Sequence, residues 1–269
     1  MKYLKMDGPY TDYGRPDMWD EESPIKCCVD THTRDTECKP NEQVALLIEP
    51  RSIQRDVYLK MEKNYKNFKY VFTHDSKLLN NIPNAKPFIW GGVWCRCENP
   101  VKDKFMSILS SDKKYAELHR VRLRTALMFK DNGNVDVYGT CIGKRVDPIQ
   151  THEHYKYAVV VENYIDDLWI TEKILNCFAT KTIPIYLGSP KISEYFNPDG
   201  IIQVHDEQEL QNTIKLMTKH VSYYNEMYNE DYVQEAINEN FEKSKNFEGF
   251  EERFYSKYEK EIGEMLDAI

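Results

Sequence analysis

Two apolar runs joined by a helical pattern form the clearest local signal in the chain. Residues 157–161 (YAVVV) are apolar throughout and end on the polar pair Glu162 and Asn163. A second apolar run follows at 182–187 (TIPIYL), and the helical pattern between the two begins after Thr171. Continuous apolar runs of this length are typical of strands buried on both faces of a parallel sheet. The segment therefore predicts a βαβ unit, with a ligand site beyond the carboxyl end of its first strand.

The same alternation of strands and helices continues through the rest of the chain. Apolar runs that predict strands lie at 44–48, 69–73, 105–109, 135–138 and 201–204, and helical patterns lie at about 53–65, 119–130, 207–220 and within 222–269. Strands alternating with helices predict an α/β fold with parallel sheets. Residues 1–42 are rich in turn formers and acidic residues, so we expect irregular structure there, and 98–104 (ENPVKDK) is the best linker candidate.

Charge and hydropathy exclude two classes of protein. The net charge of −8 over 269 residues argues against a nucleic-acid partner held by a broad basic face. No apolar stretch approaches the roughly 20 residues of a membrane span, so no integral membrane segment is expected. The first residues also lack the apolar core of a signal peptide, which predicts a cytoplasmic protein.

The cysteines predict reduced thiols. Their number is seven, which is odd, and no secretory signal accompanies them. A zinc site is the alternative, built from Cys27, Cys28, Cys38, Cys95 and Cys97. This spacing matches no standard zinc finger or ribbon, so no metal site is expected.

The start of the helix after Thr171 has the chemistry of an anion site. Thr171 is a good N-cap residue, and the free N–H groups of a first helical turn bind phosphate. Lys173 adds a positive charge, and Glu172 can accept hydrogen bonds from ribose hydroxyls. In the alternative interpretation, Glu172 only favours the helix dipole and Lys173 is a solvated surface residue. The spacing alone does not decide between the two.

The segment 155–206 resembles the donor-binding motif of glycosyltransferase family 10, the α1,3/α1,4-fucosyltransferases. The matching features are the Glu162-Asn163 pair after a strand, Ile170-Thr171-Glu172-Lys173, Ile183-Pro184-Ile185, Gly188 and Phe196-Asn197-Pro198. Residues 135–139 (VDVYG) fit the same family, so that 105–206 is covered well and the first hundred residues only weakly.

The resemblance implies a GT-B fold, with two Rossmann-like domains whose parallel sheets face a cleft. It places a short, reduced acceptor-side domain at 1–101 and a donor-binding domain with C-terminal helices at 102–269. It implies inverting transfer of L-fucose from GDP-β-L-fucose to a saccharide hydroxyl, with an α1,3-type linkage. No cofactor is obligatory; a divalent metal is compatible with the reaction but not required. A cytoplasmic enzyme of this kind fits a place peripheral to a membrane where glycans are assembled.

The resemblance also implies roles for individual donor-site residues. Glu172 and Lys173 are expected on the ribose and phosphate side of the donor, and Glu162 and Asn163 line the same pocket. Trp169 stands where the family usually has tyrosine, so stacking on the donor is kept while a phenol contact is lost. An arginine after the VDVYG strand binds the diphosphate, and Arg145 matches it, with Lys144 as the runner-up.

Inversion requires a general base that deprotonates the attacking hydroxyl. In the family this base is a glutamate after a strand of the first domain, and Glu49 in LLIEPRS matches it. His74 and Asp75, after the next strand, are the competing candidates. Two other functions stay open: a GT-B transferase that uses another nucleotide sugar, and a non-catalytic relative that binds saccharides or acts as a scaffold.

Overall fold

The computed structural model describes residues 4–7, 22–33 and 39–268, which form two compact units. Unit 1 comprises Met1–Trp90, Asp166–Trp169 and Gly249–Ile269, and unit 2 comprises Gly91–Ile165 and Ile170–Glu248. Each unit contains one five-stranded sheet in which all the paired strands are parallel. The predicted α/β class with parallel sheets is therefore confirmed.

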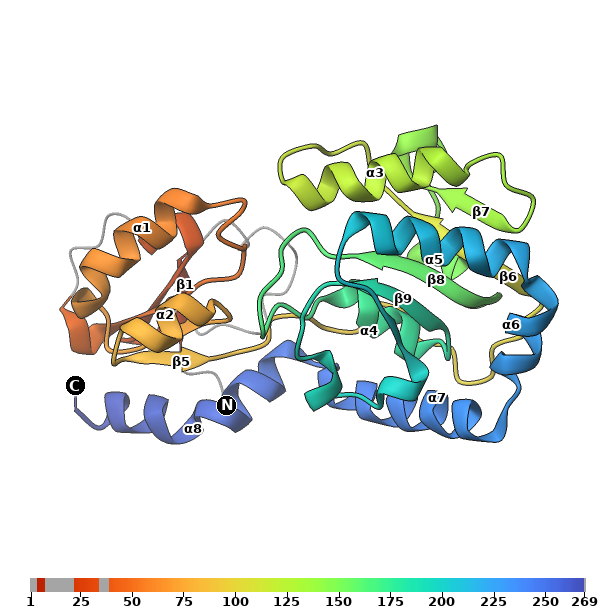
Figure 1. The fold of residues 1–269 in the computed structure, drawn as a ribbon. Helices are drawn as coiled ribbons and strands as arrows, with labels where there is room; N and C mark the ends of the chain where they lie inside the picture. The colour runs from red at the N-terminus through yellow and green to blue at the C-terminus, as the bar shows by residue number, and fades with distance from the viewer. Residues whose placement is uncertain (1–3, 8–21, 34–38, 269) are drawn as a thin grey trace. The chain divides into compact units, whose positions relative to one another are not determined.

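The strands of unit 1 lie in the sheet in chain order. They are β1 (Lys5–Asp7), β2 (Lys26–Val29), β3 (Gln43–Leu46), β4 (Val71–Thr73) and β5 (Ala85–Pro87). Helix α1 (Arg55–Asn64) connects β3 to β4, and helix α2 (Ser76–Asn81) connects β4 to β5 (Figure 1). Because the strands have only three or four residues each, the sheet is small.

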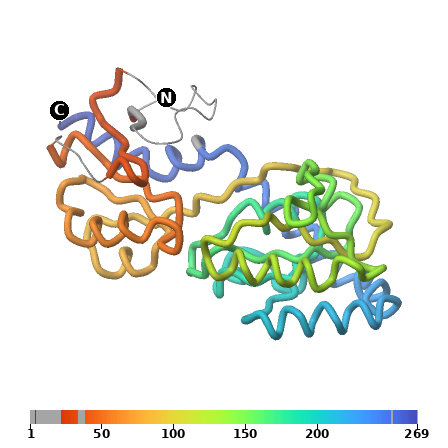
Figure 2. The backbone as a smooth tube through the Cα atoms, turned by 90° about the horizontal axis from the view of Figure 1, so that it is seen from above, coloured from red at the N-terminus to blue at the C-terminus, as the bar shows by residue number. Residues whose placement is uncertain are grey.

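Alternate residues of β3 face two different hydrophobic clusters. Ala45 packs with Val57 and Met61 of α1, whereas Val44 and Leu46 pack with the aromatic face of α8 (Phe250–Leu266). Figure 2 shows this C-terminal helix, in blue, beside the red and orange segments of unit 1. The alternation follows from the two-residue period of a strand. Both faces of the small sheet are thus covered.

The structure differs from the sequence-based expectations at three places in unit 1. Residues 1–42 were expected to be irregular, but they include β1 and β2, which are too short to give a clear apolar pattern. The division between the units falls at Trp90 and Gly91 rather than in the linker candidate 98–104 or at residue 101. The C-terminal helix α8 belongs to unit 1, not to the second unit, because its aromatic residues complete the first sheet's core.

The sheet of unit 2 has the order β10-β9-β8-β6-β7. Its strands are β6 (Lys104–Leu109), β7 (Val135–Tyr138), β8 (Tyr155–Val161), β9 (Ile183–Leu187) and β10 (Ile202–Gln203). The chain runs from β6 outward to β7 and then returns to β8 on the other side of β6. The carboxyl ends of β6 and β8 therefore form a topological switch point, where ligands bind in open parallel sheets.

Five helices accompany this sheet, and they are α3 (Glu117–Phe129), α4 (Glu172–Ala179), α5 (Glu207–Lys219), α6 (Val221–Tyr228) and α7 (Asp231–Ser244). Helices α3 and α5 pack on one face through Val121, Ala126, Leu210 and Ile214. Helix α4 packs on β8, on β9 and on α7, and α7 lies at the lower edge of unit 2 in Figure 1. The elements predicted between 105 and 220 lie within about two residues of these bounds.

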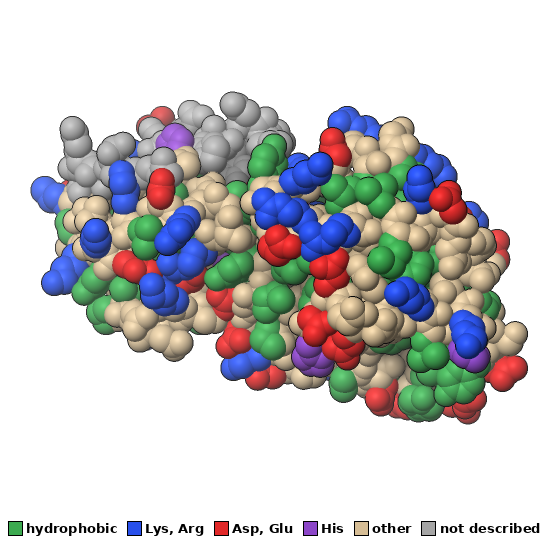
Figure 3. Space-filling view, turned by 45° about the horizontal axis from the view of Figure 1, so that its top comes forward, with side chains coloured by type: hydrophobic (Ala, Val, Ile, Leu, Met, Phe, Trp, Pro, Cys, Tyr) green, Lys and Arg blue, Asp and Glu red, His purple; other side chains and the backbone are tan. Residues whose placement is uncertain are grey.

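The surface carries both charges. On the face shown in Figure 3, basic and acidic side chains of the described residues are interspersed. Within the described part of the chain, no helix is both long and apolar enough to cross a bilayer.

Candidate functional site

A cavity of about 350 Å³ lies in unit 2 at the topological switch point. Its walls include Ser110 and Ser111 after β6, Gly139 after β7 and Val161 at the end of β8. Gly139 has φ +107°, and a Cβ there would lie 1.9 Å from the carbonyl oxygen of Ser110. Only glycine therefore lets the ends of the two strands meet at this point. The volume is within the range of small-molecule sites.

The N-terminus of α4 forms one wall of the cavity and is fixed by a buried carboxylate. Glu162 is fully buried and accepts hydrogen bonds from the Thr171 hydroxyl at 2.8 and 2.9 Å and from its N–H at 3.3 Å. The Thr171 hydroxyl in turn accepts from the N–H of Lys173 at 3.4 Å. Glu162 therefore fixes the first turn of α4 through its hydrogen bonds to Thr171. Contrary to expectation, it is not among the described residues that line the cavity.

Lys173 and Glu172 line the cavity as an ion pair, with Nζ 3.0 Å from Oε1. Lys173 also lies 3.5 Å from a carboxylate oxygen of Glu162. Burial acts to lower the pKa of Lys173, but the two carboxylates outweigh it and raise that pKa. Burial acts to raise the pKa of Glu172, but Lys173 outweighs it and lowers that pKa. Both groups are thus charged at neutral pH, with about a quarter of each side chain exposed to the cavity.

Arg122 of α3 is a cavity residue that sequence reasoning did not single out. Its Nη1 donates to the main-chain oxygen of Val161 at 3.1 Å, and only 8% of the residue is exposed. Its Nε is buried and has no hydrogen-bond partner among the described residues. Burial lowers the pKa of Arg122, although the guanidinium stays charged. A buried cation with an unused N–H, in a cavity wall, is suited to hold an anionic oxygen.

Arg145 also lines the cavity, on an exposed part of the loop after β7. Its neighbour Lys144 is not among the lining residues; its ammonium lies 4.3 Å from the centre of the Tyr138 ring. The structure therefore brings Arg145, rather than Lys144, to the cavity that contains Arg122 and Lys173. Among the described lining residues, three cationic side chains and one anionic side chain line this space, which favours an anionic ligand.

The cavity wall also includes an indole ring. The indole of Trp94 lines it and is 69% exposed, although its main chain is fixed because Asn176 Oδ1 accepts from the N–H of Trp94 at 2.9 Å. Asn176 is almost fully buried and lines the cavity as well. A large aromatic ring left open beside a polar cavity offers a stacking surface to a flat or sugar ring.

Two other predicted donor residues lie outside this cavity wall. Asn163 is half-buried just beyond β8 and is not among the described lining residues. Trp169 is buried in unit 1, where its ring centre lies 4.3 Å from that of His74. In this structure the Trp169 ring packs on an imidazole and not in the cavity wall, and stacking of Trp169 on a donor stays a prediction. Spacing along the chain did not reveal that the loop at 166–169 leaves unit 2.

The three candidate bases lie close in unit 1, but only one has a side chain suited to the role. Glu49 is half-buried after β3. Asp75 is fully buried and holds Arg51 through two hydrogen bonds, at 2.8 and 2.9 Å, while it caps α2. His74 is fully buried, and burial lowers its pKa to about 4. Glu49 therefore remains the best candidate of the three.

The described cysteines form no disulfide bond. Cys95, Cys97, Cys141 and Cys177 are thiols, and burial raises the pKa of Cys95 to about 12. No three His, Cys, Asp or Glu side chains of the described residues come together as metal ligands. Cys38, part of the zinc alternative, lies outside the described residues, and the expectation of no metal stays a prediction.

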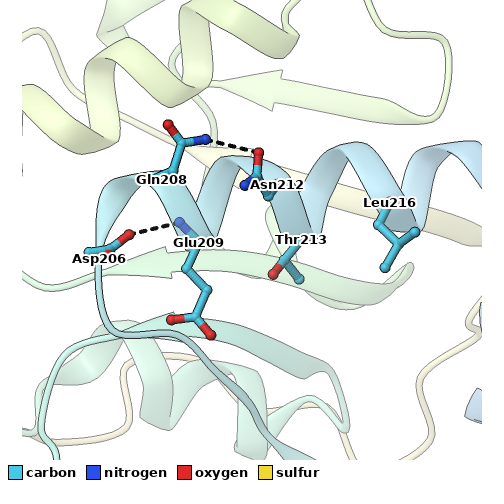
Figure 4. Close-up of a pocket in the computed structure, with 6 residues that line it drawn as sticks. All are labelled: Asp206, Gln208, Glu209, Asn212, Thr213 and Leu216. Carbon is cyan, nitrogen blue, oxygen red and sulfur yellow. Dashed lines mark hydrogen bonds between the residues drawn. The ribbon is translucent and has the colours of Figure 1, made fainter.

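A second concave surface lies on α5 alone and has a different character (Figure 4). Its residues are Asp206, Gln208, Glu209, Asn212, Thr213 and Leu216, all from one helix and its N-cap. The carboxylate of Asp206 accepts from the N–H of Glu209, and Gln208 donates to Asn212. Because these polar groups already serve the helix, the cavity at the switch point is the better candidate site.

Comparison with known proteins identifies the family. The model of glycosyltransferase family 10 (fucosyltransferase), C-terminal part, matches residues 99–250, more than half of the chain and every strand of the second sheet. Over 80 residues the chain is 35% identical to the α-(1,3)-fucosyltransferase FucT of Helicobacter pylori, and over 102 residues it is 28% identical to a fucosyltransferase-like protein of Arabidopsis thaliana. These matches cover 29% and 36% of the chain but only 17% and 20% of the two relatives.

Solved structures support the fold over nearly the whole chain. A crystal structure of an α1,3-fucosyltransferase with GDP matches with a TM-score of 0.55 and 14% identity, covering 91% of this chain and 89% of that one. The structure of TarM matches with a TM-score of 0.56 and 11% identity, covering 87% and 54%. At such identities the likeness concerns the fold, which is of the GT-B type. Together with the family model, it confirms the resemblance seen in the sequence: the chain belongs to glycosyltransferase family 10.

Proposed function

We propose that this chain transfers L-fucose from GDP-β-L-fucose to a saccharide hydroxyl, with inversion and an α1,3-type linkage. The observation that carries the proposal is the cavity at the switch point of unit 2, where Arg122, Arg145 and Lys173 meet around Glu172. It lies inside the segment matched by the family model. The names of the relatives agree with this donor sugar and linkage.

In this proposal the diphosphate of the donor lies against the first turn of α4. The N–H groups of that turn, the Lys173 ammonium and the unused Nε of Arg122 meet the phosphate oxygens, and Arg145 covers them from the loop. Glu172 accepts from the ribose hydroxyls. Charge builds up on GDP as the glycosidic bond breaks, and preorganised cations stabilise it most at that moment. No step requires a metal.

Glu49 is the proposed general base. Its carboxylate accepts the proton of the acceptor hydroxyl, whose oxygen attacks the anomeric carbon of fucose. GDP leaves that carbon from the opposite face of the sugar ring, so the anomeric configuration is inverted. Unit 1 then supplies the acceptor side and unit 2 the donor side. A cytoplasmic location stays a prediction from the sequence.

A nucleotide-binding comparison tests the donor part of the proposal. Isothermal calorimetry with GDP, UDP and dTDP should give clear binding for GDP and at least tenfold weaker binding for the other two. Preference for UDP or dTDP would favour the alternative of another nucleotide sugar. Binding of GDP without any transfer to saccharides would favour the non-catalytic relative.

A further inference from the structure

The main chain of Glu49 is held from both sides by buried polar groups of unit 1. The carboxylate of Asp30 accepts from the N–H of Ile48 at 2.8 Å and from the N–H of Glu49 at 3.2 and 3.3 Å. The hydroxyl of Tyr58 donates to the carbonyl oxygen of Glu49 at 2.7 Å. Asp30 and Tyr58 are both fully buried. The peptide groups on the two sides of the Glu49 Cα are thus fixed by side chains from two other elements.

Asp30 holds this position at a cost in backbone energy. It follows β2 directly and has φ +47°, in the left-handed region of backbone conformation that residues other than glycine rarely adopt. Backbone strain of this kind is found mainly at functional sites. A hydrogen bond of 2.6 Å from the Thr33 hydroxyl to the Asp30 carbonyl oxygen secures the turn.

Tyr58 is itself fixed by two neighbours, Arg51 and His74. The guanidinium of Arg51 lies 4.8 Å from the centre of its ring and is bound at its other side by Asp75. Nε2 of His74 lies 3.2 Å from the Tyr58 hydroxyl. Because the single hydroxyl proton goes to the carbonyl oxygen of Glu49, Nε2 of His74 is the donor. Burial lowers the pKa of this imidazole to about 4, so it is neutral with its proton on Nε2. The indole of Trp169 packs on the same imidazole.

From this geometry we propose that Tyr58 and Asp30 are positioning residues for Glu49, with His74 and Trp169 supporting Tyr58. The inference rests on the proposed function, in which Glu49 is the general base. Neither residue is expected to touch a substrate; together they fix the direction in which the Glu49 side chain leaves the main chain. A displacement of about 1 Å in a catalytic group costs up to 10²-fold in rate, so this restraint acts on turnover.

The test compares Tyr58→Phe with the wild-type chain and with Tyr70→Phe. Tyr70 is a tyrosine of unit 1 whose hydroxyl forms no hydrogen bond within the described residues, so its variant controls for the loss of a hydroxyl as such. Tyr58→Phe keeps the ring that Arg51 covers. We expect the kcat of Tyr58→Phe to fall about 10- to 100-fold, with KM for GDP-fucose and affinity for GDP unchanged, while Tyr70→Phe stays within twofold of the wild type.

A double-mutant comparison separates positioning from general stability. If Tyr58 acts through Glu49, Tyr58→Phe should not lower the residual rate of Glu49→Gln any further. A similar extra loss in the Glu49→Gln background would contradict the inference, and so would full activity of Tyr58→Phe beside an inactive Glu49→Gln. In that last case the general base stands and only the positioning role fails. Full activity of Glu49→Gln would instead remove the base and the inference together.

If Tyr58→Phe does not fold, the variant Asp30→Asn can be used to test the same inference. Asparagine adopts the left-handed backbone as readily as aspartate, and it keeps one acceptor oxygen but loses the second. The expected result is again a lower kcat with unchanged GDP affinity. A variant that folds, binds GDP and turns over at the wild-type rate would overturn the role of Asp30.

Discussion

The ammonium of Lys173 lies 3.5 Å from the carboxylate of Glu162, a residue that is completely buried at the end of β8. The same carboxylate accepts a hydrogen bond from the hydroxyl of Thr171, which caps helix α4, whose second residue is Lys173. Glu162 thereby sets both the helix start and the position of the cation. In the family motif, a glutamate follows a strand and a lysine lies in the next helix. In this chain the two residues are linked by the ion pair and by the cap that Glu162 holds.

Lys173→Met should weaken the binding of GDP by about 10- to 100-fold, because one charge-assisted hydrogen bond to a phosphate oxygen is lost. Isothermal calorimetry measures this directly. Lys191→Met, which removes a half-exposed lysine of the same unit, is the control and should bind as the wild type does. An affinity for GDP that does not change in Lys173→Met would refute the phosphate role.

Arg122→Met should weaken GDP binding to a similar extent, since the unused Nε in the cavity wall is lost while the aliphatic packing is kept. The matched control is Arg120→Met, on the same helix, whose side chain is 48% exposed and pairs with Glu117. Equal affinities of the two variants would mean that Arg122 serves only the fold, through its hydrogen bond to Val161.

The helical period contains the signal that points to Arg122. At 100° per residue, Arg120 and Arg124 lie on one side of α3, and Arg122 falls on the opposite, apolar side with Ala126 and Phe129. The helical period thus distinguishes the arginine that faces the core from the two that face solvent. Trp169 is a different case: no local pattern tells that 166–169 pack in unit 1.

Glu172→Gln should reduce the discrimination between GDP and 2′,3′-dideoxy-GDP. In the wild type the carboxylate accepts from the ribose hydroxyls, so we expect GDP to bind about tenfold or more tightly than the dideoxy analogue. The variant should bind the two nucleotides with nearly equal affinity. Glu194→Gln, at an exposed glutamate of unit 2, should keep the wild-type ratio. A ratio that Glu172→Gln leaves unchanged would place the ribose elsewhere.

Burial of His152 should make the fold sensitive to acid. Burial lowers the pKa of this imidazole to about 3, and the nearby ammonium of Lys102 acts in the same direction. The unfolded chain binds the proton near pH 6.5, so stability is complete above that pH and falls as the pH decreases. The loss amounts to about 2 kcal/mol per buried neutral imidazole between pH 7.5 and pH 5.

Urea unfolding of His152→Gln at these two pH values measures the contribution. The variant should lose about 2 kcal/mol less unfolding free energy than the wild type over the same interval. His220→Gln, at an exposed histidine, should lose as much as the wild type. An identical loss in all three chains would show that His152 is already protonated in the folded state.

The fold was predictable where strands are long and buried on both faces. The seven residues of β8 and the five of β9 give continuous apolar runs, and their bounds follow from the sequence. In β1 and β2, with three and four residues, no period is visible, and these strands form because neighbouring strands supply their hydrogen bonds. The C-terminal helix α8 has a clear helical period, but the sheet on which it packs lies far away in the sequence. The helix itself was therefore predictable, and its position in unit 1 was not.

The most direct test of the account is transfer itself, measured with GDP-fucose and a panel of saccharide acceptors in the wild-type chain and in Glu49→Gln. GDP release and the mass of the acceptor are followed together, with UDP- and dTDP-sugars in parallel. The account predicts that the wild type adds one fucose to an acceptor only from GDP-fucose, and that Glu49→Gln binds GDP normally but transfers about 10²- to 10⁴-fold more slowly. Transfer from another nucleotide sugar, or full activity of Glu49→Gln, would contradict it.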